Sequence, residues 1–389
     1  MKGAFFHDHV MKENNGNFYS NGGLPYKVFR RYLTICDSLI VSTRVEKVDE
    51  EIAKFLVMSS GEQVQMQPIK NYKTVPDYII NNAKIKKEIR NIISSVDIVI
   101  VRLPSILGSI AFYEAKKLNK NCIVEVVGCA WDALMNYGKD LKGKILAPYM
   151  FFRTKRIVKN AKNVIYVTEK FLQKRYPTKG NSIGCSNVNL ERVDEKILEE
   201  RIQKIKNLDN NKKIMIGLVG SLNVRYKGHE MAIKALKGIS NNYDVELHFL
   251  GKGDKEKWIK MAEKYNVKDK VFFDGVLPAG EQVYKWMDDK DILFAPSSAE
   301  GLPRAVIEAM SRGCPIIGTR VGGIPELLSD NVLCDKNQYK KLEEITIKLL
   351  NDKNEMINQS NKNFNKSKIY LKNIIDERRE NFLKEATKK

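Results

Sequence analysis

In the second half of the chain, short apolar runs alternate with segments of helical periodicity. The runs at 214–220 and 245–251 are typical of buried strands, and the segment 230–239 between them has the spacing of an amphipathic helix. In the next segment, apolar residues recur at i, i+3, i+4 and i+7, namely Trp258, Met261, Ala262 and Tyr265. This alternation predicts a parallel sheet covered by helices, and therefore one Rossmann-like α/β domain.

The first half repeats this pattern less regularly, with apolar runs at 39–43, 96–103, 122–128 and 163–168. These runs predict a second α/β domain. A charged stretch almost without aromatic residues separates the two halves and is typical of a domain boundary. We therefore expect an N-terminal domain at 1–190, a linker at 191–212, a second domain at 213–367 and a C-terminal helix at 368–389.

The length and composition agree with a folded two-domain protein. A chain of 389 residues with 43% hydrophobic and 29% charged residues suits two domains of roughly 150 to 200 residues each. No apolar stretch has the length of a membrane-spanning helix, and the first residues lack the apolar core of a signal peptide. A cytoplasmic protein is therefore expected. The six cysteines show no C-x-x-C spacing, so reduced thiols are expected.

The formal net charge of +20 indicates an acidic partner or surface. Positive charge concentrates in 152–179, where Glu169 is the only acidic residue among the basic side chains of Arg153, Lys155, Arg156, Lys159, Lys162, Lys170, Lys174, Arg175 and Lys179. Apolar residues are interleaved with them, at Phe151, Phe152, Ile165, Tyr166, Phe171 and Tyr176. Two interpretations remain open: a solvated basic face, or contact with an anionic membrane surface.

The segment 297–328 contains the most informative candidates for ligand binding. In it, Glu300 and Glu308 stand eight residues apart across a strand end and a helix start. Gly301 would let the backbone approach a ligand, and Pro303 suits a first helical turn whose free amides favour a diphosphate. Glu308 could accept hydrogen bonds from two ribose hydroxyls. The alternative is an ordinary ion pair between Arg304 and Glu308 on a solvated helix face.

Two longer strings of residues give more specific evidence than the spacing of the two glutamates. The string EGLPRAVIEAMSRGCPIIGTRVGGIPELL (300–328) resembles the E-x7-E region of retaining glycosyltransferases of family 4, and VGSLNVRYKGHEMAIKAL (219–236) resembles that family's glycine-rich and Lys-Gly motifs. The resemblance implies a GT-B fold, in which two Rossmann-like domains face each other across a cleft and the last helix returns to the N-terminal domain. It also implies sugar transfer with retention from a nucleotide-sugar, UDP favoured, with no metal or other cofactor.

The resemblance also implies roles for individual residues. Lys227 and Arg225 would neutralise the leaving diphosphate, Glu308 would hold the ribose, and Glu300 would orient the transferred sugar. Ser221 stands where the family more often has an arginine, which puts the role of Arg225 in question. The remaining positions expected to contact the donor are Gly220, Ser221, Gly251, Val276, Gly301, Leu302 and Pro303.

Acceptor-side positions are expected in the first half of the chain. Gly22 and Gly23 precede a basic helical segment and resemble the family's acceptor-side glycine loop, although a plain turn has the same composition. Trp131 and Asp132 follow a strand where the resemblance implies the acceptor pocket, and Asp132 could equally cap a helix. No metal is expected at the polar residues of the apparent first strand, His7, Asp8 and His9.

The partners implied are a nucleotide-sugar, a lipid-linked or saccharide acceptor of surface polysaccharide or glycolipid assembly, and an anionic membrane surface, with no nucleic acid. A peripheral protein at the inner face of the cell membrane is therefore expected. The alternatives are a nucleotide-sugar epimerase of the same fold and a basic nucleotide- or nucleic-acid-binding protein without catalysis. Nothing in the sequence resembles a helix-turn-helix, a zinc finger or an RNA-binding signature.

Overall fold

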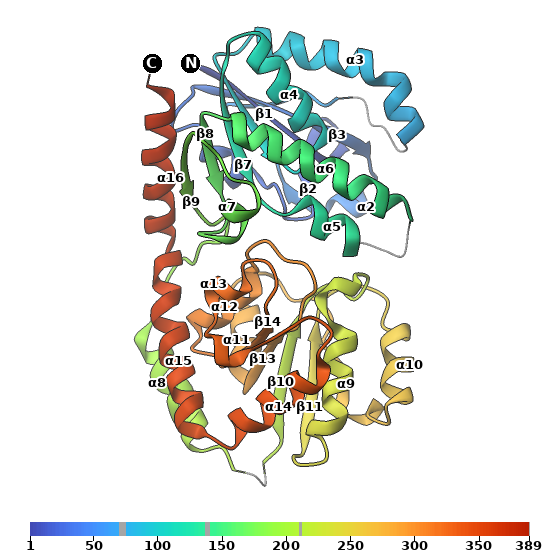
Figure 1. Ribbon diagram of the computed structural model, residues 1–389, viewed down its shortest axis with the longest axis vertical. Coiled ribbons are helices and arrows are strands. Elements are labelled where there is room, and N and C mark those ends of the chain that lie inside the picture. Colours follow the sequence, from blue (N-terminus) through green and yellow to red (C-terminus); the bar gives the residue numbers. More distant parts are fainter. Residues whose placement is uncertain (70–74, 137–140, 210–211, 389) are drawn as a thin grey trace. The chain divides into compact units, whose positions relative to one another are not determined.

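The computed structural model describes residues 1–69, 75–136, 141–209 and 212–388. The chain divides into two compact units. The first unit comprises residues 1–130, 149–185 and 376–389, and the second comprises 131–148 and 186–375. Each unit contains one sheet and its covering helices (Figure 1).

The sheet of the first unit is mainly parallel. Its strands run in the order β4-β2-β1-β6-β7-β8-β9, and β3 pairs with both β1 and β5. The bounds are β1 Lys2–Asn14, β2 Asn17–Ser20, β3 Ser38–Lys47, β4 Val57–Met58, β5 Val64–Met66, β6 Ile98–Leu103, β7 Asn121–Val126, β8 Asn163–Tyr166 and β9 Asn181–Gly184. Every residue of β6 is buried, as expected of a central strand covered on both faces.

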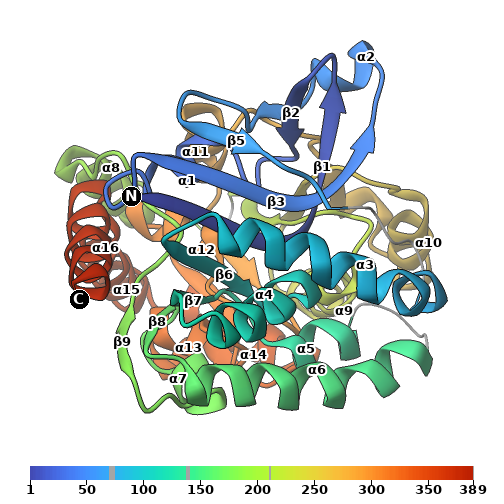
Figure 2. The same cartoon turned by 90° about the horizontal axis from the view of Figure 1, so that it is seen from above.

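Helices α3, α4 and α6 lie side by side along one face of this sheet (Figure 2). The helices with residues in this unit are α1 Tyr26–Arg30, α2 Glu50–Ala53, α3 Val75–Ser94, α4 Ile106–Lys117, α5 Ala130–Asn136, α6 Leu141–Asn160, α7 Phe171–Arg175 and α16 Lys372–Thr387. From Asp376 onward the chain belongs to this unit, where Asn121 donates a hydrogen bond to the carbonyl of Ala386 (2.6 Å).

The sheet of the second unit is entirely parallel, in the order β12-β11-β10-β13-β14-β15. Its strands are β10 Ile214–Val219, β11 Val245–Leu250, β12 Val271–Phe273, β13 Ile292–Ala295, β14 Ile316–Thr319 and β15 Leu333–Cys334. The order reverses between β10 and β13, which are hydrogen-bonded neighbours. Ligands of such sheets bind at the carboxyl ends of the strands beside this reversal.

The α-helices of the second unit are α8 Glu195–Lys206, α9 His229–Ile239, α10 Glu256–Lys264, α11 Glu281–Asp289, α12 Arg304–Ser311, α13 Ile324–Leu327, α14 Tyr339–Leu350 and α15 Lys353–Ser367. The described part of this unit also includes the 3₁₀ helices η1 Arg225–Lys227, η2 Lys268–Lys270, η3 Asp330–Val332 and η4 Lys368–Tyr370.

The predicted fold class of two Rossmann-like sheets is confirmed. The segment 191–212, expected as a linker, contains α8, which packs within the second unit. Leu198 and Ile205 of α8 are buried, and the Arg201 guanidinium donates to the carbonyls of Met287 and Lys290. A charged, amphipathic helix of this kind resembles a solvated linker in composition, because its few apolar residues lie on one face.

Candidate functional site

The loops that follow β10 and β13 meet at the carboxyl edge of the second sheet, and there Lys227 and Glu300 form an ion pair. The Lys227 Nζ lies 2.6 Å from the Glu300 Oε1, and the two side chains are 24% and 10% exposed. Ser297 donates to the same carboxylate oxygen at 2.8 Å. The structure therefore brings together two residues 73 positions apart in the sequence, as a cation and an anion held at the edge of the sheet.

Glycines make this approach possible. A Cβ on Gly228, which has φ +82°, would lie 2.1 Å from the carbonyl oxygen of Pro296. A Cβ on Gly220 would lie 2.8 Å from the Cγ of Lys227. Because no side chain fits at either position, the Lys-Gly motif can pack directly against the loop after β13.

The loop after β14 supports Glu300 from the other side. A Cβ on Gly322, at φ +59°, would lie 2.1 Å from the Glu300 carbonyl oxygen. The amide of Gly323 donates to the carbonyl of Gly301 at 2.7 Å. Backbone packing thus fixes the position of Glu300 and Gly301 as well as that of Lys227.

Glu308 lies in the second turn of α12 and is half-buried. Burial raises the pKa of its carboxyl group, and the nearby Arg304 opposes this rise. Within the described part of the chain, Arg304 and Glu308 form no ion pair, so the alternative of a simple salt pair finds no support in the geometry. A half-buried carboxylate of this kind is suited to accept hydrogen bonds from a ligand.

The residues between Glu300 and α12 lead into the start of that helix. Gly301 and Leu302 are half-buried, and Pro303 is the residue immediately before the first turn, with φ −74° and ψ 120°. The first amides of α12 have no partners within the helix, and this end of a helix attracts anions.

The other predicted donor-side residues follow the neighbouring strands. Arg225 is exposed in η1, and Ser221 donates through its hydroxyl to the carbonyl of Lys252 at 3.2 Å. The amide of Gly251 donates to the carbonyl of Gly275 at 2.7 Å, and the adjacent Val276 is 63% exposed. All of these positions lie at the carboxyl ends of β10, β11 and β12.

Two further residues support this edge and were not predicted from the sequence. Ser297 orients Glu300, as described above. His229, directly after the Lys-Gly motif, is fully buried and stacks on Trp258 with ring centroids 4.9 Å apart. Burial lowers the pKa of His229 to about 4, so the ring is neutral and acts as a packing group beneath the Lys227 loop. Only its place beside that motif could have drawn attention to His229.

In the first unit, a bulge in β1 contains His7, Asp8 and His9, directly after the point where the pairing of β1 with β6 ends. The pairing register of β1 with β3 shifts between Phe6 and Val10, and bulges of this kind redirect side chains. The Asp8 carboxylate accepts hydrogen bonds from the amides of Ile106 and Leu107, and therefore caps α4.

Gly22 and Gly23 lie in the loop after β2, and Gly23 is close to His9 of this bulge. Gly22 has φ +82°, which favours glycine, and a Cβ on Gly23 would lie 3.5 Å from the Cε1 of His9. Burial lowers the pKa of both His7 and His9, that of His7 to about 3, so both rings are neutral at pH 7. The described residues contain no cluster of three or more potential metal ligands.

The first unit also contains a buried ionic cluster. Glu125 of β7 accepts hydrogen bonds from Arg102 of β6 at 2.9 Å, and lies 3.3 Å from the guanidinium of Arg379 of α16. Burial alone would raise the pKa of Glu125, but Arg102, Arg31 and Arg379 lower it to about 2. The pairing of a strand residue with a residue of the C-terminal helix fixes that helix on the unit.

Trp131 and Asp132 lie in the first turn of α5, and Trp131 is 36% exposed.

The apolar residues that alternate with basic residues in the segment 151–179 separate into a buried group and an exposed one. Ile165, Tyr166 and Tyr176 are buried, because β8 and the turn after α7 face the core, so these three side chains belong to the core and do not contribute to a membrane-facing surface. Phe152 of α6 is 64% exposed. No described helix combines the length and the apolar character needed to cross a membrane.

Comparison with known proteins gives consistent results. A family model described as glycosyl transferases group 1 matches residues 199–367. Protein CapJ of Staphylococcus aureus is 37% identical over 348 residues, which cover 89% of this chain and 85% of CapJ. Among solved structures, Anabaena Alr3699/HepE in complex with UDP superposes with a TM-score of 0.67 at 13% identity, over 99% of this chain and 100% of that one. WaaG, a glycosyltransferase involved in lipopolysaccharide biosynthesis, gives a TM-score of 0.62 at 16% identity, over 98% and 99%.

Proposed function

This chain belongs to the group 1 glycosyltransferases, and we propose that it transfers a hexose-type sugar from a UDP-sugar to a saccharide or lipid-linked acceptor in the assembly of a surface polysaccharide such as a capsule. The observation that carries the proposal is the Lys227–Glu300 pair at the strand-order reversal of the second sheet. The UDP in the HepE complexes supports the choice of donor, and the similarity to CapJ supports the polysaccharide context.

In the proposed mechanism, the second unit binds the donor through its diphosphate and ribose. Lys227, Arg225 and the first amides of α12 neutralise the diphosphate, whose charge grows as it leaves, and preorganised cations stabilise such charge most effectively. Glu308 accepts hydrogen bonds from the ribose hydroxyls. Glu300, already oriented by Ser297, holds the sugar that is transferred.

We propose retention of the anomeric configuration, on the basis of the resemblance to family 4. The bond between the anomeric carbon and the diphosphate breaks, and the acceptor oxygen bonds to the same face of the sugar. An oxygen of the departing diphosphate takes the acceptor's proton, so no protein nucleophile is needed. Lys227 and Arg225 supply the positive charge that a metal supplies in other transferases, so we propose that the reaction is metal-independent.

The test is a transfer assay with UDP-, GDP-, ADP- and dTDP-sugars, and NMR identification of the anomer formed. The proposal predicts release of UDP, an unchanged anomeric configuration, and full activity in excess EDTA. Inversion would refute the retaining mechanism, and loss of activity in EDTA would refute metal independence. Epimerisation of the donor without an acceptor would point to the alternative enzyme class.

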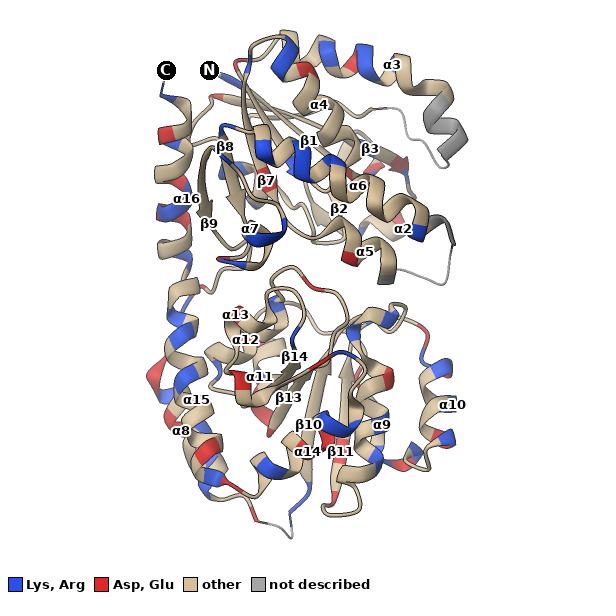
Figure 3. Ribbon diagram, viewed as in Figure 1, with Lys and Arg blue, Asp and Glu red and all other residues tan. Residues whose placement is uncertain are grey.

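We further propose that the first unit docks on an anionic membrane to reach a lipid-linked acceptor. Basic residues occur along α6 (Figure 3), and Lys155, Arg156 and Lys159 among them are exposed. Tyr149 and Phe152 of the same helix are 55% and 64% exposed. Basic residues combined with exposed aromatic side chains are typical of membrane-surface contact. Cosedimentation with vesicles tests this: binding to phosphatidylglycerol but not to phosphatidylcholine vesicles is expected, and no binding to either would refute it.

A further inference from the structure

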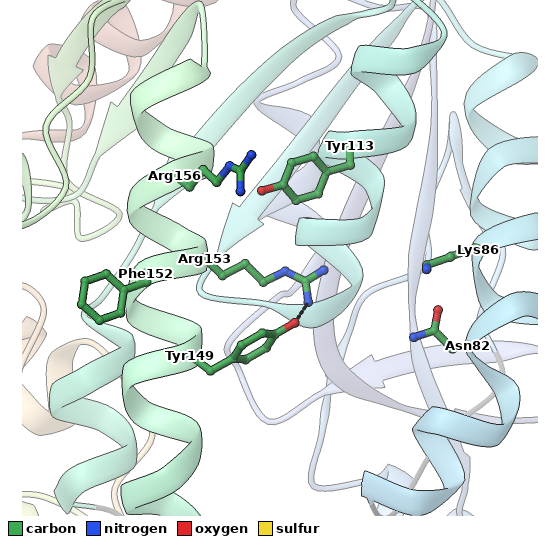
Figure 4. Close-up of a pocket in the computed structure, with 7 residues that line it drawn as sticks. All are labelled: Asn82, Lys86, Tyr113, Tyr149, Phe152, Arg153 and Arg156. Carbon is green, nitrogen blue, oxygen red and sulfur yellow. Dashed lines mark hydrogen bonds between the residues drawn. The ribbon is translucent and has the colours of Figure 1, made fainter.

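A cavity of about 600 Å³ lies in the first unit between α3, α4 and α6 (Figure 4). Its walls carry three basic side chains and three aromatic ones, from Lys86, Tyr113, Tyr149, Phe152, Arg153 and Arg156. The donor-binding residues proposed above all belong to the second unit, whereas the residues that line this cavity belong to the first.

No carboxylate lines the cavity among the described residues. Helix α6 contains no acidic residue at all, and Glu114, the only acidic residue of α4, lies 2.7 Å from Lys117 and 3.9 Å from Arg90. Lys86 and Arg156 form no ion pair within the described ranges. The cavity therefore collects positive charge that the protein does not itself neutralise, which favours an anionic ligand.

The basic side chains are also oriented. The Arg153 guanidinium donates to the Tyr149 hydroxyl at 2.7 Å and lies 5.7 Å from the centre of the same ring. Figure 4 shows Arg156 of α6 and the Tyr113 phenol of α4 directed toward one another. Lys86 and Asn82 of α3 form the opposite wall. Guanidinium groups with free N–H donors match the geometry of a phosphate group.

Apolar surface adjoins this charge. Phe152, whose ring is mostly exposed, and the half-exposed Tyr149 both line the cavity. A soluble phosphate compound would satisfy the basic residues and leave the phenyl ring of Phe152 in water. A phospholipid satisfies both, because its phosphate adjoins an apolar phase in which aromatic rings are favoured.

We propose that this cavity binds the phosphate headgroup of an anionic membrane phospholipid. The inference rests on the proposed docking of the enzyme on a membrane and adds to it one discrete headgroup site. Arg153 and Arg156 hold the phosphate, Lys86 and Asn82 contact it from α3, and Phe152 enters the interface beside it.

The experiment compares two double variants with equal loss of charge from the same helix. Arg153→Gln/Arg156→Gln alters the cavity, and Lys155→Gln/Lys159→Gln removes two exposed lysines that do not line it. Each protein is titrated with phosphatidylglycerol vesicles, with fatty-acid vesicles of equal surface charge, and with soluble glycerol phosphate. A thermal shift with UDP confirms that each variant is folded.

The site predicts that the arginine pair weakens binding to phosphatidylglycerol vesicles about 10-fold more than the lysine pair does, because diffuse attraction alone would weaken both alike. It also predicts that the wild-type preference for phosphatidylglycerol over fatty-acid vesicles disappears in the arginine variant. Equal losses in the two variants would overturn the site and leave membrane docking intact. Failure of the wild type to bind any anionic vesicle would refute docking itself. Binding of glycerol phosphate as tight as that of vesicles would overturn the lipid as the ligand.

Discussion

The two units differ in whether their charged residues are accessible at the carboxyl edge of the sheet or buried within the fold. In the second unit, Lys227 and Glu300 pair at the edge itself, where both remain partly accessible to a ligand. In the first unit, Glu125 and its arginines lie buried within the fold, and the edge carries the neutral rings of His7 and His9. In the second unit this charge stays available for the diphosphate of the proposed mechanism, whereas in the first unit the buried charges pair with one another and hold the fold together.

The largest effect expected is on catalysis, from the accessible lysine of the second unit. Lys227→Ala removes the preorganised cation opposite the leaving diphosphate, and we expect kcat to fall by about 10² to 10³. Lys237→Ala, at an exposed position of α9, is the matched control and should retain nearly full activity. Steady-state kinetics with a UDP-sugar measures both. Equal kinetic constants in the two variants would show that Lys227 contributes no more to catalysis than an exposed lysine of α9 does.

A structural role for the buried cluster predicts a large effect on stability. Glu125→Gln removes the buried carboxylate that pairs with Arg102 and should lower the free energy of unfolding by about 3 kcal/mol. Glu169→Gln removes a half-exposed partner of Arg378 and should cost less than about 1 kcal/mol. Urea unfolding at pH 7 measures the difference. A catalytic defect in Glu125→Gln without a loss of stability would contradict the assignment.

The same cluster has a defined pH dependence. Because the folded-state pKa of Glu125 is lowered to about 2, its stabilising contribution is present above the ordinary value of 4.5 and is lost as the pH falls toward 2. The stability difference between wild type and Glu125→Gln should therefore shrink between pH 5 and pH 2. A difference that stays constant over this range would argue against a charged Glu125 in the folded protein.

Glu308→Gln should separate binding from stability within the second unit. Loss of a charged acceptor for the ribose should weaken UDP binding by about 10-fold or more. Burial raises the folded-state pKa of Glu308, so the protonated carboxyl is favoured in the folded protein. The stability that this provides is present at low pH and is lost as the pH rises through the raised pKa, because the buried side chain must then carry a charge. The unliganded variant should therefore be at least as stable as wild type at pH 7. Calorimetry with UDP and thermal unfolding without it give the two readings.

The smallest effect concerns the acceptor-side loop. Gly22→Ala forces an alanine to φ +82°, which should distort the loop and reduce transfer to the acceptor several-fold without affecting UDP binding. Gly23→Ala places a methyl group in ordinary contact with His9 and should be nearly neutral. If the two variants gave equal transfer rates, the loop would have no role beyond that of a turn.

The two units also differ in how much of their structure could be predicted from the sequence. The parallel sheets followed from the alternation of apolar runs and helical segments, and the donor-side residues came from contiguous strings such as 219–236 and 300–328. The pairing of Lys227 with Glu300 depends on the order of the strands, which no local pattern contains. Ser297 was not predicted, because its contribution depends on the approach of Lys227 and Glu300 to the same point.

In the first unit, tertiary contacts decided most of what the sequence left open. Composition could not show that Ile165, Tyr166 and Tyr176 turn inward while Phe152 remains exposed, because the apolar residues of a basic segment look alike until the sheet is assembled. The bulge that redirects His7 to His9 is likewise a property of strand pairing. The burial of Glu125 among Arg31, Arg102 and Arg379, which come from three distant segments, also depends on tertiary contacts.

In the proposed mechanism, the second unit binds a uridine nucleotide through Lys227 and Glu308. The most direct test is a thermal-shift titration of the wild type, Lys227→Ala and Glu308→Ala with UDP, GDP, ADP and dTDP. We predict that UDP raises the melting temperature of the wild type most strongly and that both variants lose most of this shift. If no nucleotide stabilised the wild type at millimolar concentration, or if both variants responded as the wild type does, the claim would be contradicted.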